Sequence, residues 1–167
     1  KKISIFFLFL IVIVNGQEDS TPPELVSFSF TPDTINTTNS NDTVKFTIRL
    51  KDNLSGVGWA RPIIVSPDNQ HHIYGNSLSI QKSAPIVLDT TFVSTAVFPQ
   101  FALPGDWGLR MQFRDQATAN SIQIYPDSLK AKGFPNSLHV ISIEDKLPPE
   151  LVSFSFDPDT INTTNSN

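Results

Sequence analysis

The chain has 167 residues, no cysteine, and 12 basic against 16 acidic residues, for a formal net charge of −4. This acidic balance argues against nucleic acid and anionic membrane surfaces as partners. Without disulfides, the folded part must draw its stability from its own core or from a bound metal.

The first residues have the composition of a secretory signal peptide. Lys1 and Lys2 precede the apolar run Ile3–Val14, and the small residue Gly16 follows shortly after it. Twelve residues form only about 18 Å of helix, which is too short for a bilayer core of about 30 Å. We therefore expect residues 1–16 to be cleaved, leaving a secreted or cell-surface protein with no membrane insertion after cleavage.

One stretch of the sequence occurs twice. Thr21–Asn41 and Leu147–Asn167 are identical at 19 of 21 positions, at an offset of 126 residues. Near-identity at a fixed offset is typical of a tandem array. This repeat divides the chain into a leader or linker at 17–23, one complete repeat at 24–143, a linker at 144–147, and the truncated start of the next repeat at 148–167.

Short apolar stretches separated by turn residues predict an all-β domain within the repeat. Val26, Phe28 and Phe30 alternate with serines, so we expect them on the buried face of a first strand. The clearest alternation occurs at 43–50 and 107–114, where Trp107 is in phase with the apolar residues and is expected in the core. Further strands are expected at 59–65, 71–74, 78–81, 91–98, 122–125 and 138–143.

A short helix is expected over residues 127–133, with Asp127 as its N-cap and Gly133 at its end. A polar loop is expected from Asn36 to Asn41. Seven to nine antiparallel strands and one short helix in about 125 residues are typical of an immunoglobulin-like β-sandwich.

Four segments, in this order, resemble the immunoglobulin-like tandem repeats of large secreted or cell-surface, adhesin-type proteins. They are Asp19–Pro23, the Asp-x-x-Ser-Gly-Val loop Asp52–Val57, Phe98-Pro99 with the turn Pro104–Trp107, and Asp115–Ala117. The sequence departs from the family pattern after Ala117, where Thr-Ala-Asn stands in place of Gly-Asn. The resemblance covers residues 19–143 and implies a β-sandwich used as a spacer or adhesive unit. Some such repeats bind calcium.

Three aspartates are candidate metal ligands. Asp52 and Asp115 stand at equivalent ends of two alternating strands, and Asp19 in the linker can reach the same pole. Calcium takes six to eight oxygen ligands, so two loops and a linker would together hold a calcium ion and stiffen the joint between repeats. The alternative is that the aspartates accept hydrogen bonds from backbone amides in their own turns.

Four asparagines, Asn36, Asn41, Asn53 and Asn162, each begin an Asn-x-Ser/Thr sequon. In a eukaryotic secretory pathway these sites would carry glycans, whereas in a bacterium they would be plain polar loops. A glycan on Asn53 would crowd a metal bound to its neighbour Asp52, so we do not expect both at once.

No catalytic motif is found, so an enzyme is not expected and no cofactor other than calcium is implied. The first hypothesis is a non-catalytic spacer or adhesion module whose partners are neighbouring repeats and an unidentified protein or glycan at the cell surface. The alternative is a carbohydrate-binding module of a secreted enzyme or receptor. An exposed aromatic patch made by Trp59, Tyr74 and Phe101 on one sheet would favour sugar binding, and their burial would favour the spacer.

Overall fold

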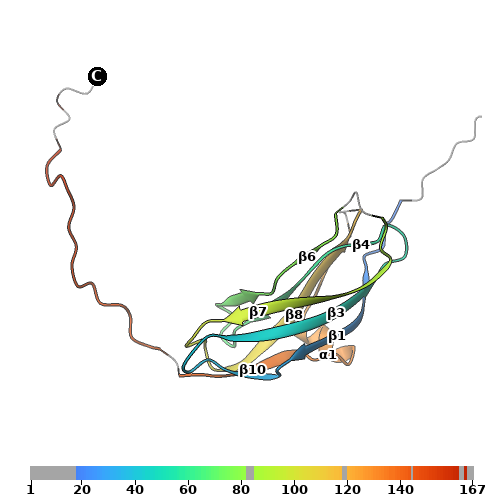
Figure 1. Cartoon of the computed structure of the whole chain (residues 1–167), viewed down its shortest axis with the longest axis horizontal. Coiled ribbons are helices and arrows are strands. Elements are labelled where there is room, and N and C mark those ends of the chain that lie inside the picture. The colour runs from blue at the N-terminus through green and yellow to red at the C-terminus, as the bar shows by residue number, and fades with distance from the viewer. Residues whose placement is uncertain (1–17, 82–84, 118–119, 144, 162–163, 165–167) are drawn as a thin grey trace, which may run out of the picture.

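The computed structural model describes residues 18–167 except 82–84, 118–119, 144, 162–163 and 165–167 (Figure 1). The expected signal peptide at 1–16 and the sequon at Asn162 therefore lie outside the described residues. In the part of the chain that is described, no helix has the length and apolar character needed to cross a membrane.

Ten strands and one helix form the described fold. The strands are β1 (Glu24–Thr31), β2 (Thr34–Asn36), β3 (Asp42–Lys51), β4 (Val57–Val65), β5 (His72–Tyr74), β6 (Leu78–Ser79), β7 (Asp89–Phe98), β8 (Gly105–Asp115), β9 (Ser121–Ile124) and β10 (Ser137–Ile141), with helix α1 (Pro126–Ala131) before β10. One sheet has the order β1-β3-β7. The other has the order β2-β10-β8-β4-β5, with β6 beside β4 and β9 beside β8.

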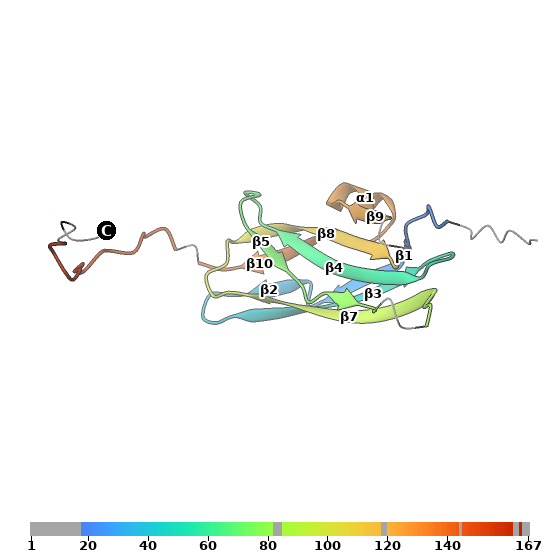
Figure 2. The same cartoon turned by 90° about the horizontal axis from the view of Figure 1, so that it is seen from above.

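The predicted all-β sandwich with one short helix is confirmed. Figure 2 shows β4 and β8 in one layer and β3 and β7 in the other. The ten described strands are one more than the upper end of the seven to nine expected, because the three-residue strand β2 was not predicted. Every strand pairing among the described residues is antiparallel except that of β2 with β10.

The core is built from the alternating residues of the longest strands. On β3 and β8 the inward residues are at most 2% exposed, as the alternation predicts: Val44, Phe46, Ile48, Leu50, Trp107, Leu109, Met111 and Phe113. Phe46 stacks on Phe28 with ring centroids 6.2 Å apart, and Trp107 meets Phe98 edge-on at 5.3 Å. The first contact lies within the β1-β3-β7 sheet, whereas the second joins β7 of that sheet to β8 of the other.

The first strand buries a different set of residues from the predicted one. The register of β1 against β3 shifts between Leu25 and Ser27. This bulge places Leu25 and Phe28 in the core, each 5% exposed, and leaves Val26 36% exposed. The predicted burial of Val26 was wrong because one extra residue in a strand reverses the alternation on one side of the bulge.

One further local prediction changes, at the start of the short helix. Helix α1 begins after Tyr125 with Pro126 in its first turn, so Asp127 is a first-turn acidic residue and not the N-cap. Proline suits this position because the first backbone N–H groups of a helix need no partner within it. Gly133 follows the helix with φ of +77°, as expected for a terminating glycine.

The leader and the C-terminal segment leave the sandwich at opposite poles (Figure 1). We call the end of the sandwich where Glu24 pairs with Lys51 the N-terminal pole. The other end, where β10 finishes beside the start of β8, is the C-terminal pole. Among the described residues after β10, from 142 onward, none belongs to a strand.

Candidate metal centre at the N-terminal pole

The structure brings the three candidate aspartates together at the N-terminal pole. Asp52 follows β3, Asp115 ends β8, and Asp19 precedes β1. One carboxylate oxygen from each of the three lies within 4.8 Å of the other two. Oxygens that share a calcium ion at 2.3–2.6 Å can be at most about 5 Å apart, so this spacing fits a single ion.

The Asp52 carboxylate is buried, and only one of its oxygens is satisfied. Its Oδ2 accepts hydrogen bonds from the backbone N–H groups of Leu54 at 3.1 Å and Gly56 at 2.6 Å. Asp52 is 4% exposed, and its Oδ1 is buried with no hydrogen-bond partner among the described residues. Such a buried acceptor costs about 1–3 kcal/mol, and more when it is charged, so a cation fits at this oxygen.

Asp19 connects the leader to the loop after β3. Its Oδ1 accepts from the N–H of Thr21 at 3.0 Å, and its Oδ2 accepts from the N–H of Ser55 at 2.9 Å. Hydrogen bonding from Ser55, and then from Thr21, lowers the pKa of Asp19 below its ordinary value. The carboxylate is therefore ionised at neutral pH. Asp52 and Asp19 therefore accept the backbone hydrogen bonds that were expected as the alternative to a metal site. These bonds still leave Oδ1 of Asp52 without a partner among the described residues.

Asn120 is a member of this site that the sequence reasoning missed. Its Nδ2 donates to the backbone oxygen of Asp19 at 2.8 Å and to Oδ2 of Asp115 at 2.6 Å. Neither Asp19 nor Asp52 forms an ion pair with a described lysine or arginine. The sequence signal that could have found Asn120 was the Gly-Asn that the resembled repeats have after the alanine. In this chain Thr-Ala-Asn stands there, so the asparagine comes one position later.

A glycine allows the two loops of the site to approach each other. A Cβ on Gly58 would lie 2.3 Å from the carbonyl oxygen of Asp115, so any larger residue would push β4 and β8 apart. The register of these strands shifts at this point, between Val57 and Trp59. Gln116 then donates its N–H to the carbonyl of Gly56 at 2.9 Å, which fixes the Asp52 loop beside Asp115.

The three described sequon asparagines are exposed at the surface. The side-chain oxygen of Asn36 accepts from the N–H of Thr38 at 3.0 Å, and that of Asn41 accepts from the N–H of Gln100 at 2.8 Å. Asn53 lies next to the buried Asp52 and is itself exposed. Solvent access therefore allows a glycan at each of these positions.

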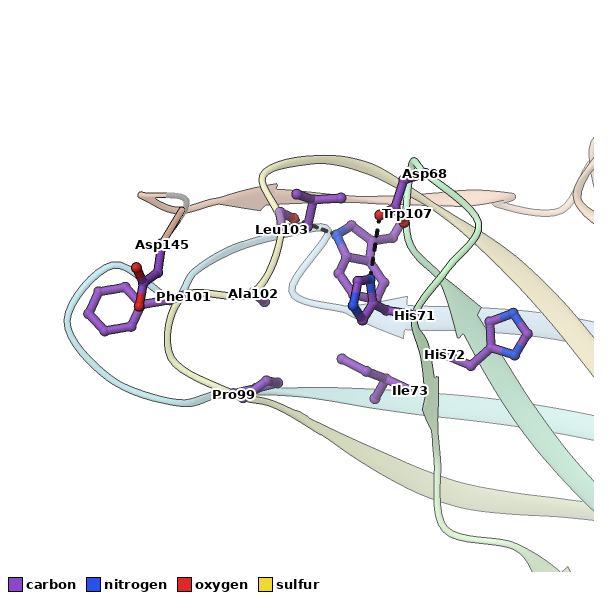
Figure 3. Close-up of a pocket in the computed structure, with 10 residues that line it drawn as sticks. All are labelled: Asp68, His71, His72, Ile73, Pro99, Phe101, Ala102, Leu103, Trp107 and Asp145. Atoms are coloured by element: carbon purple, nitrogen blue, oxygen red, sulfur yellow. Dashed lines mark hydrogen bonds and ion pairs between the residues drawn. The ribbon is translucent and has the colours of Figure 1, made fainter. Parts of the chain in front are cut away.

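A pocket of about 460 Å³ lies at the opposite, C-terminal pole (Figure 3). Trp107 lines it and donates from Nε1 to the carbonyl of Leu103 at 2.7 Å. Phe101 and Asp145 lie together on another side (Figure 3). Asp145 corresponds to Asp19 at the repeat offset of 126 residues. The residue at the position equivalent to Asp19 therefore lies beside the C-terminal pole of the sandwich.

The β4–β5 hairpin forms the other side of this pocket. His71 Nδ1 lies 3.5 Å from a carboxylate oxygen of Asp68. A hydrogen bond from the Ser66 hydroxyl, and then one from the Gln70 N–H, lowers the pKa of Asp68. His71 and its neighbour His72 are both exposed, and their rings point in different directions (Figure 3). This arrangement is that of a polar hairpin.

Trp59, Tyr74 and Phe101 do not form one aromatic patch. Trp59 is half-buried on β4 and Tyr74 is 50% exposed on β5. Their ring centroids lie 5.2 Å and 4.5 Å from the guanidinium carbon of Arg61. Phe101 is in the β7–β8 connection and lines the pocket at the C-terminal pole, whereas Trp59 lines a different pocket. The three rings are therefore neither all buried nor gathered in one exposed patch, so their positions favour neither the spacer nor the sugar-binding hypothesis.

Neither a known protein-family model nor a curated protein sequence matches this chain. The repeat, the fold and the two sites of the sandwich are therefore the observations that bear on function.

Proposed function

We propose that residues 24–143 are one immunoglobulin-like repeat of a secreted or cell-surface tandem array, acting as a non-catalytic spacer or adhesion module. One observation carries the proposal. The chain joins the sandwich at one pole and leaves it at the other (Figure 1), and the departing segment carries a copy of β1. Repeats connected in this way follow one another end to end, with neighbouring repeats as their first partners.

The exposure of the second copy supports this reading. Leu151 and Phe154 are 79% and 78% exposed, whereas the corresponding Leu25 and Phe28 are each 5% exposed. The same side chains are buried only where β3 provides a partner strand. The segment at 148–167 therefore needs the remainder of a second repeat to cover its apolar residues.

Calcium binding at the N-terminal pole is the second part of the proposal. Asp19 belongs to the leader, whereas Asp52 and Asp115 belong to the sandwich, so an ion held by all three ties leader and sandwich together. In the following repeat Asp145 would have the role of Asp19, and only residues 142–144 separate it from β10. Extracellular calcium modules bind at about 10⁻⁴–10⁻³ M, so the joint would stiffen at extracellular calcium levels.

A two-repeat protein tests the proposal. Asn167 corresponds to Asn41, so adding a copy of residues 42–143 after Asn167 completes a second repeat. Small-angle scattering in calcium should give a maximum dimension close to twice that of residues 17–143 alone. A compact particle with the two units side by side, or a second unit that does not fold, would contradict the end-to-end array.

The same protein separates the calcium part from the array part. In chelator, we expect the distribution of interatomic distances to broaden, because the linker is no longer held to the second sandwich. Asp145→Asn should give the broad distribution even in calcium. An Asp127→Asn variant is the matched control, because Asp127 is exposed on helix α1 and lies outside both the aspartate cluster and the pocket that Asp145 lines.

Carbohydrate binding remains a second candidate function, favoured by the partly exposed Trp59 and Tyr74 on neighbouring strands. It is compatible with an array, because these residues lie on the outer face of a sheet and leave both poles available for neighbouring repeats.

A further inference from the structure

We propose that the outer face of β4, β8 and β9 binds an anionic saccharide through its arginine and aromatic side chains. This inference names a ligand class for the adhesion part of the proposed function. It depends on that function only for the extracellular setting. Neither the metal centre nor the joint between repeats contributes to it.

The residues of this face are placed by the strand register. Trp59 on β4 pairs with Arg114 on β8, and Arg61 pairs with Gln112. Arg114 in turn pairs with Ser121 on β9. Because directly paired residues project from the same face of a sheet, these five side chains gather in one place. They line an open pocket of about 310 Å³.

Aromatic rings hold two of the arginines of the face. The guanidinium of Arg61 lies between the rings of Trp59 and Tyr74, at 5.2 Å and 4.5 Å from their centroids. Arg110, further along β8, lies 5.2 Å from the centroid of Tyr125. Contact with a ring restrains a guanidinium by cation–π attraction. An arginine held in this way loses less side-chain entropy when it binds an anion.

The arginines of this face lack carboxylate partners. Among the described residues, the one arginine–carboxylate ion pair is that of Arg49 with Asp89, on the other sheet. The Nε atoms of Arg61 and Arg110 are buried and make no hydrogen bond within the described chain. Strands β4 and β9 contain no acidic residue, and neither does the segment 108–114 of β8. In a chain with more acidic than basic residues, this face is a local region of positive charge.

These side chains together match the chemistry of an acidic sugar. Guanidinium groups bind carboxylate and sulfate groups through paired hydrogen bonds. The amide of Gln112 and the hydroxyl of Ser121 can donate to and accept from sugar hydroxyls. The partly exposed rings of Trp59 and Tyr74 offer flat surfaces with an apolar body. The net charge of −4 would repel an extended nucleic acid, which favours a short saccharide over such a polyanion.

The test uses residues 17–167 and three oligosaccharides of equal length: a hexuronate, a sulfated saccharide and a neutral glucan. Binding is measured by calorimetry and by NMR titration, each in calcium and in chelator. We expect one or both anionic saccharides to bind with and without calcium, and the neutral glucan to bind at least 10-fold more weakly. The hexuronate and sulfate arms decide which anionic group is preferred.

Two arginine variants locate the site. Arg114→Gln should weaken binding at least 10-fold without changing the thermal midpoint, because Arg114 is exposed. Arg49→Gln is the matched control, since Arg49 is an exposed strand arginine on the other sheet, and it should bind as the parent does. Arg114→Lys keeps the charge without the planar fork and should give an intermediate affinity.

Several outcomes would overturn the inference. These are no binding of either anionic saccharide, equal binding of the neutral glucan, an equal loss in Arg49→Gln, or equal binding of an oligoglutamate peptide. Binding seen only in calcium would move the ligand to the metal centre. If the saccharides fail to bind while the two-repeat protein is still extended, only this inference fails. A compact two-repeat particle that still binds the saccharides would instead count against the array.

Discussion

Replacing Asp52 with asparagine should change the stability of the repeat in opposite directions with and without calcium. The amide oxygen of asparagine can still accept the N–H groups that Oδ2 accepts from Leu54 and Gly56, so the turn is kept while one charge is removed. Asp52 and Asp115 are 4% and 1% exposed, with oxygens within 4.8 Å. Two unit charges at this distance repel by about 1 kcal/mol in water and about 3.5 kcal/mol at an effective dielectric constant of 20. In chelator, Asp52→Asn should therefore raise the free energy of unfolding by roughly 1–3 kcal/mol.

Calcium should reverse the order of the two proteins. At about 10 mM calcium and a dissociation constant of about 10⁻⁴–10⁻³ M, binding to the folded state adds about 1.4–2.7 kcal/mol to the parent. For a domain of this size the thermal midpoint moves by about 4 °C per kcal/mol. The parent midpoint should thus rise by about 6–11 °C, whereas that of Asp52→Asn should stay where it is in chelator.

Thermal unfolding followed by circular dichroism, with and without calcium, measures both effects. Asp68→Asn is the control, because Asp68 also accepts a backbone N–H, from Gln70 at 3.0 Å, but lies at the C-terminal pole. It should leave the response to calcium unchanged. If Asp52→Asn lowers the free energy of unfolding by the same small amount in calcium and in chelator, Asp52 acts only as the acceptor of the Leu54 and Gly56 N–H groups. That result would refute the reasoning for a metal site.

Three further predictions concern the fold. Phe46→Ala should lower the free energy of unfolding by about 3–5 kcal/mol in urea titrations, because Phe46 is 0% exposed. Val93→Ala, on a side chain that is 54% exposed, should change the free energy of unfolding by less than about 0.5 kcal/mol. Equal losses in Phe46→Ala and Val93→Ala would mean that the core is misplaced. Gly58→Ala should cost about 1–3 kcal/mol and weaken the calcium response, since its Cβ would lie 2.3 Å from the Asp115 carbonyl oxygen; an unchanged midpoint would contradict the close approach of β4 and β8. Deleting residues 146–167 should leave the unfolding midpoint unchanged, and a large loss would show that the repeat boundary is misplaced.

The alternation on β3 and β8 predicted the core because apolar side chains at every second position can be buried together only on one face of a strand. The same reasoning failed for β1. There the bulge between Leu25 and Ser27 exchanges Val26 for Leu25 in the core. A bulge is a response to the partner strand, so the local pattern of residues 26, 28 and 30 contained no sign of it.

The meeting of the three aspartates could be predicted in part from the sequence. Asp52 and Asp115 could be placed at one pole because each follows an alternating strand, and the repeat offset drew attention to the linker. Asn120 was not predicted, since its hydrogen bond to the backbone of Asp19 spans 101 residues of the sequence. The role of Gly58 depends in the same way on how closely two strands approach.

By itself, the sequence determined the 126-residue offset of the repeated stretch, the all-β character and the core residues of β3 and β8. Each of these follows from local composition or from self-similarity along the chain. Tertiary structure alone decided which aspartate oxygen is left unsatisfied, and that Arg61 lies between Trp59 and Tyr74 with no ion pair to a described carboxylate. Such features are set by strand register and by the packing of one sheet on the other, which bring together residues that no local pattern connects.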